Sequence, residues 1–133
     1  MKPKSSWGII IKDSKYLFIQ RSERSSRPKQ WCVPGGGIKK NEMPEQACTR
    51  EVKEEVGPTM SVNKLIRSDE TFNYYLCNLI DSNENIKLQL KECTEFEWIN
   101  LDDLLSLGEI MELQRMIRVF SDFGFNIDMS NIG

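Results

Sequence analysis

The sequence predicts a mixed α/β domain in which helices pack on a β-sheet. Three features predict it: two apolar segments at the start, a long segment without helix breakers in the middle, and further strand-like segments before a closing helical region. A regular alternation of strands and helices is absent. A chain of 133 residues is long enough for one hydrophobic core, so we expect a single domain over residues 1–133.

The first half predicts two strands, a loop and the best-defined helix. The segments "WGIIIK" and "KYLFIQR" are rich in β-branched and aromatic residues, and Asp13 and Ser14 between them predict a tight turn. Residues 22–30 have the polar composition of an exposed loop. Pro44 suits a first helical position and Gly57 suits a C-terminal cap, which predicts a helix from Pro44 to Val56.

The second half predicts more strands and a closing helical region. Residues 62–80 favour one or two strands, and the "DSNEN" that follows is a turn. The segments "IKLQL" and "EFEWI" alternate apolar and polar residues like a strand pair. A helical region begins near Asn100, is interrupted at Gly108 and resumes to Gly124. We expect a loose tail at about 125–133.

Composition and charge exclude several classes of protein. Eighteen basic and twenty acidic residues give a net charge of −2, and no block of Lys and Arg indicates nucleic-acid or membrane binding. No apolar run is long enough for a signal peptide or a membrane span, so we expect a cytoplasmic protein. The four cysteines form no C-x-x-C pair and are expected to be buried, reduced thiols.

The chain contains no histidine. A Ser-His-Asp triad, a Cys-His pair and the usual zinc sites that contain histidine are therefore excluded. Any general base must be a carboxylate, Lys, Tyr, Cys or metal-bound water.

Three glutamates converge on one face of the predicted helix. Each helical residue advances by about 100°, so Glu51 and Glu55 stack one turn apart with Glu54 beside them. A solvated acidic face, partly neutralised by Arg50, is the ordinary explanation of such a cluster. Convergent carboxylates are also the oxygen ligands that Mg²⁺ or Mn²⁺ prefers, and a bound cation removes their mutual repulsion.

A glycine triplet lies just ahead of this helix. Gly35, Gly36 and Gly37 allow the backbone to turn sharply and to approach a ligand closely. A flexible loop is the simpler interpretation of the triplet taken alone. Beside a carboxylate-bearing helix, however, the triplet can supply a carbonyl to the same cation and N–H groups to a phosphate.

Residues 36–58 combine these features at fixed spacing: Gly36, five residues, Glu42, seven residues, and then "REVKEEVG". This segment resembles the Nudix box, G-x5-E-x7-R-E-U-x-E-E-x-G-U, and departs from it only at Pro58, where the pattern has an aliphatic residue. The segments "WCVPGG" and "EFEWINLDDL" on either side are also similar to the family. The resemblance to Nudix (MutT-like) hydrolases implies an α/β/α fold, with a mixed β-sheet sandwiched between helices.

The resemblance also implies an activity and a cofactor. The activity is hydrolysis of a pyrophosphate bond in a nucleoside triphosphate, or in a nucleoside diphosphate linked to another group, with Mg²⁺ or Mn²⁺. By matching position, the metal ligands would be Gly36, Glu51, Glu54 and Glu55. One glutamate would assist in deprotonating the attacking water. Arg50 would orient the carboxylates, with Glu42 as its supporting partner.

Residues outside the box are expected to complete the site. A further metal-binding carboxylate often lies ahead of a strand that ends in tryptophan; Glu92 is the first choice and Glu95 the second. Substrate contacts are expected from Arg21, Arg24, Arg27, Gly37 and Tyr74. Tyr74 resembles a feature of dinucleoside polyphosphate hydrolases, and "PGGG" is similar to diphosphoinositol polyphosphate hydrolases, so these substrates remain open.

Two alternatives to catalysis also remain open. One is a nucleotide-sensing module that does not cleave its ligand, although the intact carboxylates of the box count against it. The other is a structural Mg²⁺ or Ca²⁺ site, which predicts metal-dependent stability without turnover. For the hydrolase we expect a small nucleotide or diphosphate substrate, with no nucleic acid duplex and no membrane as partner. A homodimer is left open.

Overall fold

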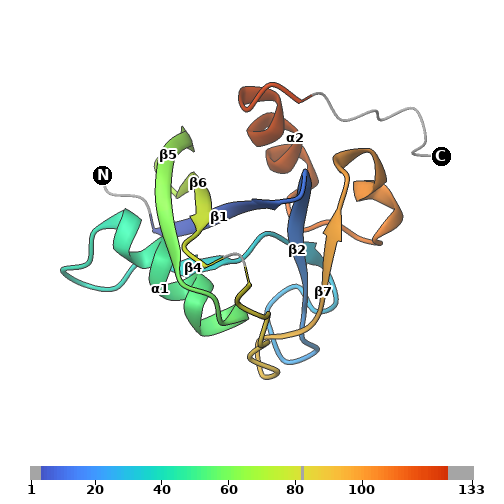
Figure 1. The fold of residues 1–133 in the computed structure, drawn as a ribbon, viewed down its shortest axis with the longest axis horizontal. Helices are drawn as coiled ribbons and strands as arrows, with labels where there is room; N and C mark the ends of the chain where they lie inside the picture. The colour runs from blue at the N-terminus through green and yellow to red at the C-terminus, as the bar shows by residue number, and fades with distance from the viewer. Residues whose placement is uncertain (1–3, 82, 126–133) are drawn as a thin grey trace.

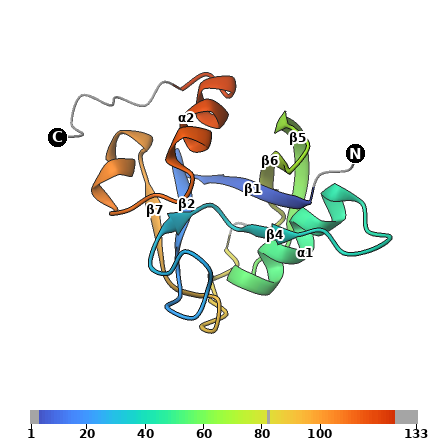
Figure 2. The same ribbon diagram turned by 180° about the vertical axis from the view of Figure 1, so that it is seen from behind.

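The computed structural model describes residues 4–81 and 83–125, which form a mixed β-sheet with helices on both sides (Figure 1). The strands are β1 (Ser5–Lys12), β2 (Lys15–Arg21), β3 (Trp31–Cys32), β4 (Gly35–Gly37), β5 (Met60–Ser68), β6 (Phe72–Leu79) and β7 (Cys93–Ile99). The helices are α1 (Pro44–Val56), the short 3-10 helix η1 (Leu101–Ser106) and α2 (Leu113–Asp122). Figures 1 and 2 show α1 and α2 on opposite sides of β1, which confirms the predicted α/β/α arrangement.

The sheet is mixed because its two central strands are parallel. The strand order is β3-β2-β1-β6-β5, with β4 paired to β1 and β7 paired to β2. Strands β1 and β6 run parallel, with Gly8 opposite Tyr75, and the other pairs are antiparallel. This topology brings β4, which carries the glycine triplet, and the end of β2 toward α1 from different parts of the chain.

The predicted hairpin and the predicted central helix are both confirmed. Asp13 and Ser14 have φ values of 51° and 64°, as a two-residue turn between twisted antiparallel strands requires. Helix α1 has the predicted bounds, and Gly57 follows it with φ 102°. Asn41, in the loop before the helix, also adopts a left-handed conformation, with φ 65°.

Helix α1 packs through its apolar stripe, and the cysteines lie in this core. Cys48 and Val52 of α1 are fully buried, and the Sγ atoms of Cys48 and Cys77 lie 3.6 Å apart between α1 and β6. All four cysteines are free thiols and buried, as the sequence predicts. Because the stripe faces the sheet, the acidic face of α1 turns toward β4 and the rim of the core.

The strand predicted for "IKLQL" is wrong. Residues 86–90 are irregular, and their backbone N–H groups bond to the end of α1: Lys87 N donates to the Val56 carbonyl at 2.7 Å, and Gln89 N donates to the Glu55 carbonyl at 2.8 Å. The last carbonyls of a helix have no partner within the helix, and this segment satisfies two of them. The "EFEWI" strand exists as part of β7, but it pairs with β2.

The closing helical region is shorter than predicted. Residues 101–106 form a 3-10 helix, and α2 begins only at Leu113. The intervening backbone pairs with β3, since Trp31 N donates to the Glu109 carbonyl and Met111 N donates to the Trp31 carbonyl, each at 2.8 Å. These bonds hold residues 109–111 beside β3, with an isolated parallel bridge between Trp31 and Ile110. The predicted tail lies almost entirely outside the described residues, as does residue 82 of the predicted turn.

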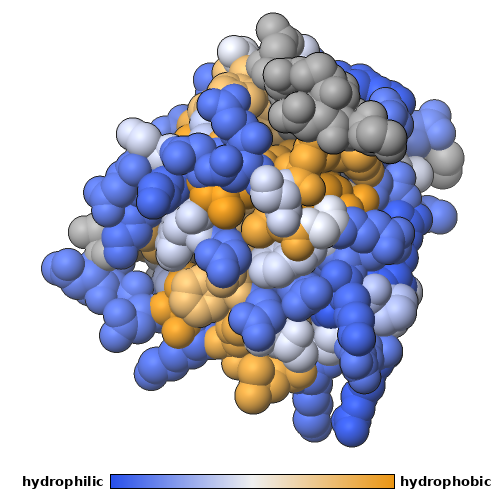
Figure 3. All heavy atoms as spheres, turned by 90° about the vertical axis from the view of Figure 1, so that its right-hand side faces the viewer, coloured by the Kyte–Doolittle hydropathy of each residue, from blue (hydrophilic) through white to orange (hydrophobic). Residues whose placement is uncertain are grey.

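The surface on the β7 side of the molecule carries an apolar area bordered by hydrophilic side chains (Figure 3). Large exposed apolar side chains in the described residues include Leu90 and Phe96. None of the helices in the described part of the chain has the length and apolar character needed to cross a membrane.

Candidate active site

The glycine triplet forms strand β4, which runs between β1 and the acidic face of α1. A Cβ atom at Gly35 would lie 2.6 Å from the Cα atom of Trp7, and one at Gly36 would lie 2.6 Å from Oε2 of Glu51. Neither position can hold a side chain without a shift of its neighbours. The glycines therefore let this backbone lie directly against the Glu51 carboxylate.

The three glutamates of α1 differ strongly in burial. Glu55 is 5% exposed, and its Oε1 accepts a hydrogen bond of 2.7 Å from Gly35 N. The Glu51 side chain is 16% exposed and that of Glu54 is 51% exposed. The carboxylates thus form a series from the core to the solvent along one helix face, as the spacing predicts.

Arg50 ties this face to the loop before the helix. Its Nε and Nη2 donate to the two carboxylate oxygens of Glu42 at 2.7 and 2.9 Å, and Nη2 also donates to the Gly37 carbonyl at 2.9 Å. Nη1 donates to Glu51 at 2.9 Å and to Glu54 at 3.2 Å. One guanidinium therefore orients two carboxylates and anchors β4, which is the arrangement expected of Arg50 and Glu42.

The pKa values of Glu55 and Glu42 are shifted in opposite directions. Burial, reinforced by the negative charges of Glu51 and Glu92, raises the pKa of Glu55 to about 8 despite its hydrogen bond from Gly35. Burial also raises the pKa of Glu51. The hydrogen bonds from Arg50 lower the pKa of Glu42 to about 2. Arg50 thus outweighs desolvation at Glu42 but not at Glu51, and the hydrogen bond to the Glu55 carboxylate comes from a backbone N–H instead of a cation.

A cleft of about 620 Å³ opens beside these residues. Its walls include the three glycines of β4 and the side chains of Glu51, Glu55 and Glu92. Glu92 is held there because Gln89 is bonded to the end of α1 and Glu92 N donates to the Gln89 carbonyl at 2.9 Å. Glu95 lies on β7 opposite Gln20 and does not line the cleft. Of the two candidates for the distal carboxylate, the structure brings Glu92 to the site.

The lining of the cleft also includes a group of basic side chains. The lining side chains with positive charge are Arg21, Arg24, Arg27, Lys91 and Arg115. Tyr74, the predicted aromatic contact, is 1% exposed and packs between Trp7 and Phe72, with ring centroids at 6.3 and 5.1 Å. Its ring belongs to the core and does not line this cleft.

The donor set of the acidic wall fits a hard divalent cation. Within residues 4–81 and 83–125, no three acidic, Cys or His side chains are already gathered around one point, because Arg50 holds Glu51 and Glu54. The available donors are nevertheless all oxygen atoms, from Glu51, Glu54, Glu55 and the Gly36 carbonyl. The close approach of Gly36 to Glu51 and the uncompensated burial of Glu55 are both consistent with a positive ion beside them.

Several residues at or near the cleft were not predicted, among them Lys91, Ser22, Glu112 and Arg115. Ser22 is 4% exposed and bonds the end of β2 to the turn at Lys91, while Glu112 and Arg115 line the cleft from the start of α2. Glu112 forms an ion pair with Arg27 and lies 3.5 Å from Arg115 Nη2. Arg115 also lies over the Phe72 ring, 4.4 Å from its centroid. No local pattern marks these residues, because only the tertiary fold brings them to the cleft.

Comparison with known proteins agrees with this geometry. The model of the NUDIX domain matches residues 2–120. The chain belongs to the Nudix family. It is a hydrolase of phosphorus-containing acid anhydrides, and hydrolases of this family generally use a divalent metal.

Similar proteins of known activity or structure support the assignment. The nucleoside triphosphatase NudI of Escherichia coli K12 is 25% identical over 129 residues, covering 84% of this chain and 91% of NudI. The MutT protein of Methanosarcina mazei has a TM-score of 0.73 at 24% identity, covering 92% of this chain and 94% of its own. A C. elegans Ap4A hydrolase has a TM-score of 0.69 at 24% identity, covering 92% and 100%. At these identities the two structures show a shared fold.

Proposed function

We propose that this Nudix protein hydrolyses a pyrophosphate bond with Mg²⁺ or Mn²⁺, and that its substrate is a nucleoside triphosphate or a nucleoside diphosphate derivative. The observation that carries the proposal is the pairing of two unlike walls around one cleft. Glu51, Glu55 and Glu92 line the cleft with the Gly36 backbone and form its acidic wall, and a group of Arg and Lys side chains that also lines the cleft forms its basic wall. A phosphate chain that carries divalent cations complements both walls.

The residues of the acidic wall would hold the metal and handle the proton of the attacking water. The cation, held by Glu51, Glu54, Glu55 and the Gly36 carbonyl, with Glu92 as a further ligand, supplies charge neutralisation and lowers the pKa of water. Water attacks one phosphorus atom, the bridging P–O bond breaks, and its electron pair leaves with the departing phosphate. One carboxylate of α1 accepts the proton, since the chain has no histidine to do so.

The other residues of the site position these groups. Arg50 fixes Glu51 and Glu54 through its hydrogen bonds, and Glu42 keeps the guanidinium in place. Arg21, Arg24 and Arg27 are placed to contact phosphate oxygens, and Gly37 offers a backbone without a side chain at the cleft wall. The hydrogen bond from Gly35 N orients the Glu55 carboxylate toward β4.

The size of the cleft and the activity of NudI favour a nucleotide substrate. A cleft of about 620 Å³ has the volume of an ordinary small-molecule site. NudI is named as a nucleoside triphosphatase and covers most of this chain. We therefore place nucleoside triphosphates first among the substrates.

The test is a phosphate-release screen over nucleoside triphosphates, nucleotide sugars, ADP-ribose, dinucleoside polyphosphates and diphosphoinositols, with Mg²⁺ and with Mn²⁺. We expect turnover with at least one nucleotide, and loss of turnover in excess chelator. Metal-dependent stability without turnover of any compound would instead indicate a structural metal site. Full activity in excess chelator would contradict the proposed mechanism.

A further inference from the structure

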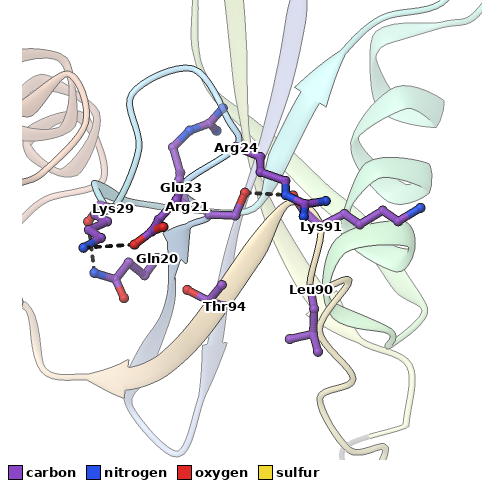
Figure 4. Close-up of a pocket in the computed structure, with 9 residues that line it drawn as sticks. Gln20, Arg21, Glu23, Arg24, Lys29, Leu90, Lys91 and Thr94 are labelled. Carbon is purple, nitrogen blue, oxygen red and sulfur yellow. Dashed lines mark hydrogen bonds and ion pairs between the residues drawn. The ribbon is translucent and has the colours of Figure 1, made fainter.

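A second pocket of about 630 Å³ shares part of its lining with the catalytic cleft, and Figure 4 shows the side chains around this second pocket. It is lined by Gln20, Arg21, Ser22, Glu23, Arg24, Lys29, Leu90, Lys91 and Thr94. Arg21, Arg24 and Lys91 also line the cleft, so these three side chains form the boundary that the two spaces share. We call them the basic strip.

No ion pair within the described residues neutralises the positive charges of the basic strip. Lys29, which lines only the second pocket, lies 3.1 Å from Glu23, the one acidic residue of the lining. In Figure 4 this pair lies on one side, and Lys91 and Leu90 lie on the other. In the part of the chain that the structure describes, neither Arg24 nor Lys91 has a hydrogen-bond or ion-pair partner for its charged group. Arg21 donates to neutral groups of Ser26, at 2.8 and 3.3 Å.

Ser22 holds the strip together from within the fold. Its N–H donates to the Glu92 carbonyl at 2.9 Å, and its Oγ donates to the Lys91 carbonyl at 2.7 Å. These bonds join the end of β2, which carries Arg21, to the turn that carries Lys91. Ser25 continues the scaffold, because its Oγ donates to the Ser22 carbonyl at 2.8 Å. The backbones that carry the three cations are therefore fixed beside one another, although like charges repel.

We propose that the second pocket is an anion subsite, and that it holds phosphate groups of the substrate that lie beyond the scissile pair. The inference rests on the proposed function for the position of the scissile bond. The strip borders both spaces, so a phosphate chain that starts at the metal-binding wall can continue past Arg21 and reach Arg24 and Lys91. The subsite favours substrates with three or more consecutive phosphates over simple diphosphates.

A series of adenosine nucleotides tests the subsite by turnover. ADP, ATP and adenosine 5′-tetraphosphate differ only in the number of phosphates. The double variant Arg24→Gln/Lys91→Gln should lower the ratio of kcat/KM for the tetraphosphate to kcat/KM for ADP by about tenfold, the value of one charged hydrogen bond. The control Lys12→Gln/Lys15→Gln removes two charges at the distant hairpin turn and should leave the ratio unchanged. An equal ratio in wild type and in the Arg24/Lys91 variant would overturn the inference.

Binding of inorganic tripolyphosphate separates the subsite from the proposed activity. In excess chelator the acidic wall repels polyanions, so equilibrium binding by calorimetry reports on the basic strip. We expect wild type and the Lys12/Lys15 control to bind tripolyphosphate about tenfold more tightly than the Arg24/Lys91 variant. If the protein shows this binding but cleaves no nucleotide, the result would contradict the proposed function and support the subsite. Equal binding in all three proteins, or none in wild type, would remove the subsite.

Discussion

The two walls of the catalytic cleft are built in opposite ways. The acidic wall comes mainly from one stretch of the chain, residues 35–55, in which a single guanidinium and one backbone N–H hold the carboxylates, and Glu92 is added from a distant turn. The basic wall comes from three distant stretches, at residues 21–27, at Lys91 and at residues 112–115. Its internal ion pairs, such as Arg27 with Glu112, are half-exposed.

From this difference we expect the acidic wall to carry out the chemistry and the basic wall to select the substrate. A metal-binding wall must hold its oxygen atoms closely, and a short strand followed by a helix does so with local contacts. A substrate-binding wall can change with its loops while the scaffold stays the same. We therefore expect substitutions on the acidic wall to lower kcat and substitutions on the basic wall to raise KM.

The largest effect is expected from Glu54→Gln. Loss of one metal-binding charge should lower turnover by about 10³-fold or more, because a metal contributes several kcal/mol to the stabilisation of the transition state. The Glu54 side chain is 51% exposed, so the circular dichroism spectrum should not change. Glu45→Gln, in the first turn of the same helix, is the control and should keep wild-type turnover. Wild-type turnover in Glu54→Gln would show that the acidic wall is not catalytic.

The next effect concerns the stability of the metal-free protein. The pKa of Glu55 is raised to about 8 from an ordinary value of 4.5, so the folded state retains this proton better than the unfolded state. The contribution of Glu55 to the free energy of unfolding is therefore fully present below pH 4.5 and is lost as the pH rises to about 8. In chelator at pH 8, Glu55→Gln should be more stable than wild type by on the order of a few kcal/mol.

Urea unfolding of both proteins at pH 5 and pH 8 measures this difference. The advantage of Glu55→Gln should shrink at pH 5, and added Mn²⁺ should stabilise wild type more than the variant. The same stability difference at both pH values would contradict the assigned electrostatics.

A smaller effect is expected from Gly36→Ala. The added Cβ would meet the Glu51 carboxylate at 2.6 Å, which should displace it and lower turnover by about tenfold. Gly37→Ala is the matched substitution, since the nearest atom to its Cβ would be the Lys4 carbonyl oxygen at 4.0 Å. Steady-state rates should therefore fall more for Gly36→Ala than for Gly37→Ala. A larger fall in rate for Gly37→Ala than for Gly36→Ala would show that the close approach of Gly36 to Glu51 is not the critical backbone contact.

The smallest effect is expected from Ser22→Ala, on the basic wall. Loss of its hydrogen bond to the Lys91 carbonyl should lower the free energy of unfolding by about 1 kcal/mol and raise KM a few-fold without a change in kcat. Ser61→Ala, at an exposed position of β5, is the control for removal of a hydroxyl group. A fall in kcat with an unchanged KM would show that Ser22 supports the catalytic step and not substrate binding.

The contrast between the walls also explains what could be predicted from the sequence. Spacing along one helix and its capping residues placed α1 and its three carboxylates correctly, because these relations are local. Glu92 could be suggested but not separated from Glu95, since its position depends on how residues 86–90 bond to the end of α1. Nothing in the sequence indicated that Arg115 lines the cleft, because only the packing of α2 brings it there.

Two of the predictions made from the sequence are wrong for the same physical reason. Tyr74 looked available as a substrate contact, but β6 lies between β1 and β5 and its ring is enclosed in the core. The alternation of "IKLQL" looked like a strand, but its backbone groups satisfy the end of a helix. In both cases the tertiary partner, and not the local pattern, decides the outcome.

The most direct test of the division between the walls is to measure kcat and KM of Glu51→Gln and Arg24→Gln with ATP and Mg²⁺. Gln at position 51 can still accept the hydrogen bond from Arg50, so only the charge is lost. We predict that Glu51→Gln lowers kcat by at least about 10²-fold with little change in KM, and that Arg24→Gln raises KM with little change in kcat. The opposite pattern, with kcat lost in Arg24→Gln and retained in Glu51→Gln, would contradict the assignment of catalysis to the acidic wall.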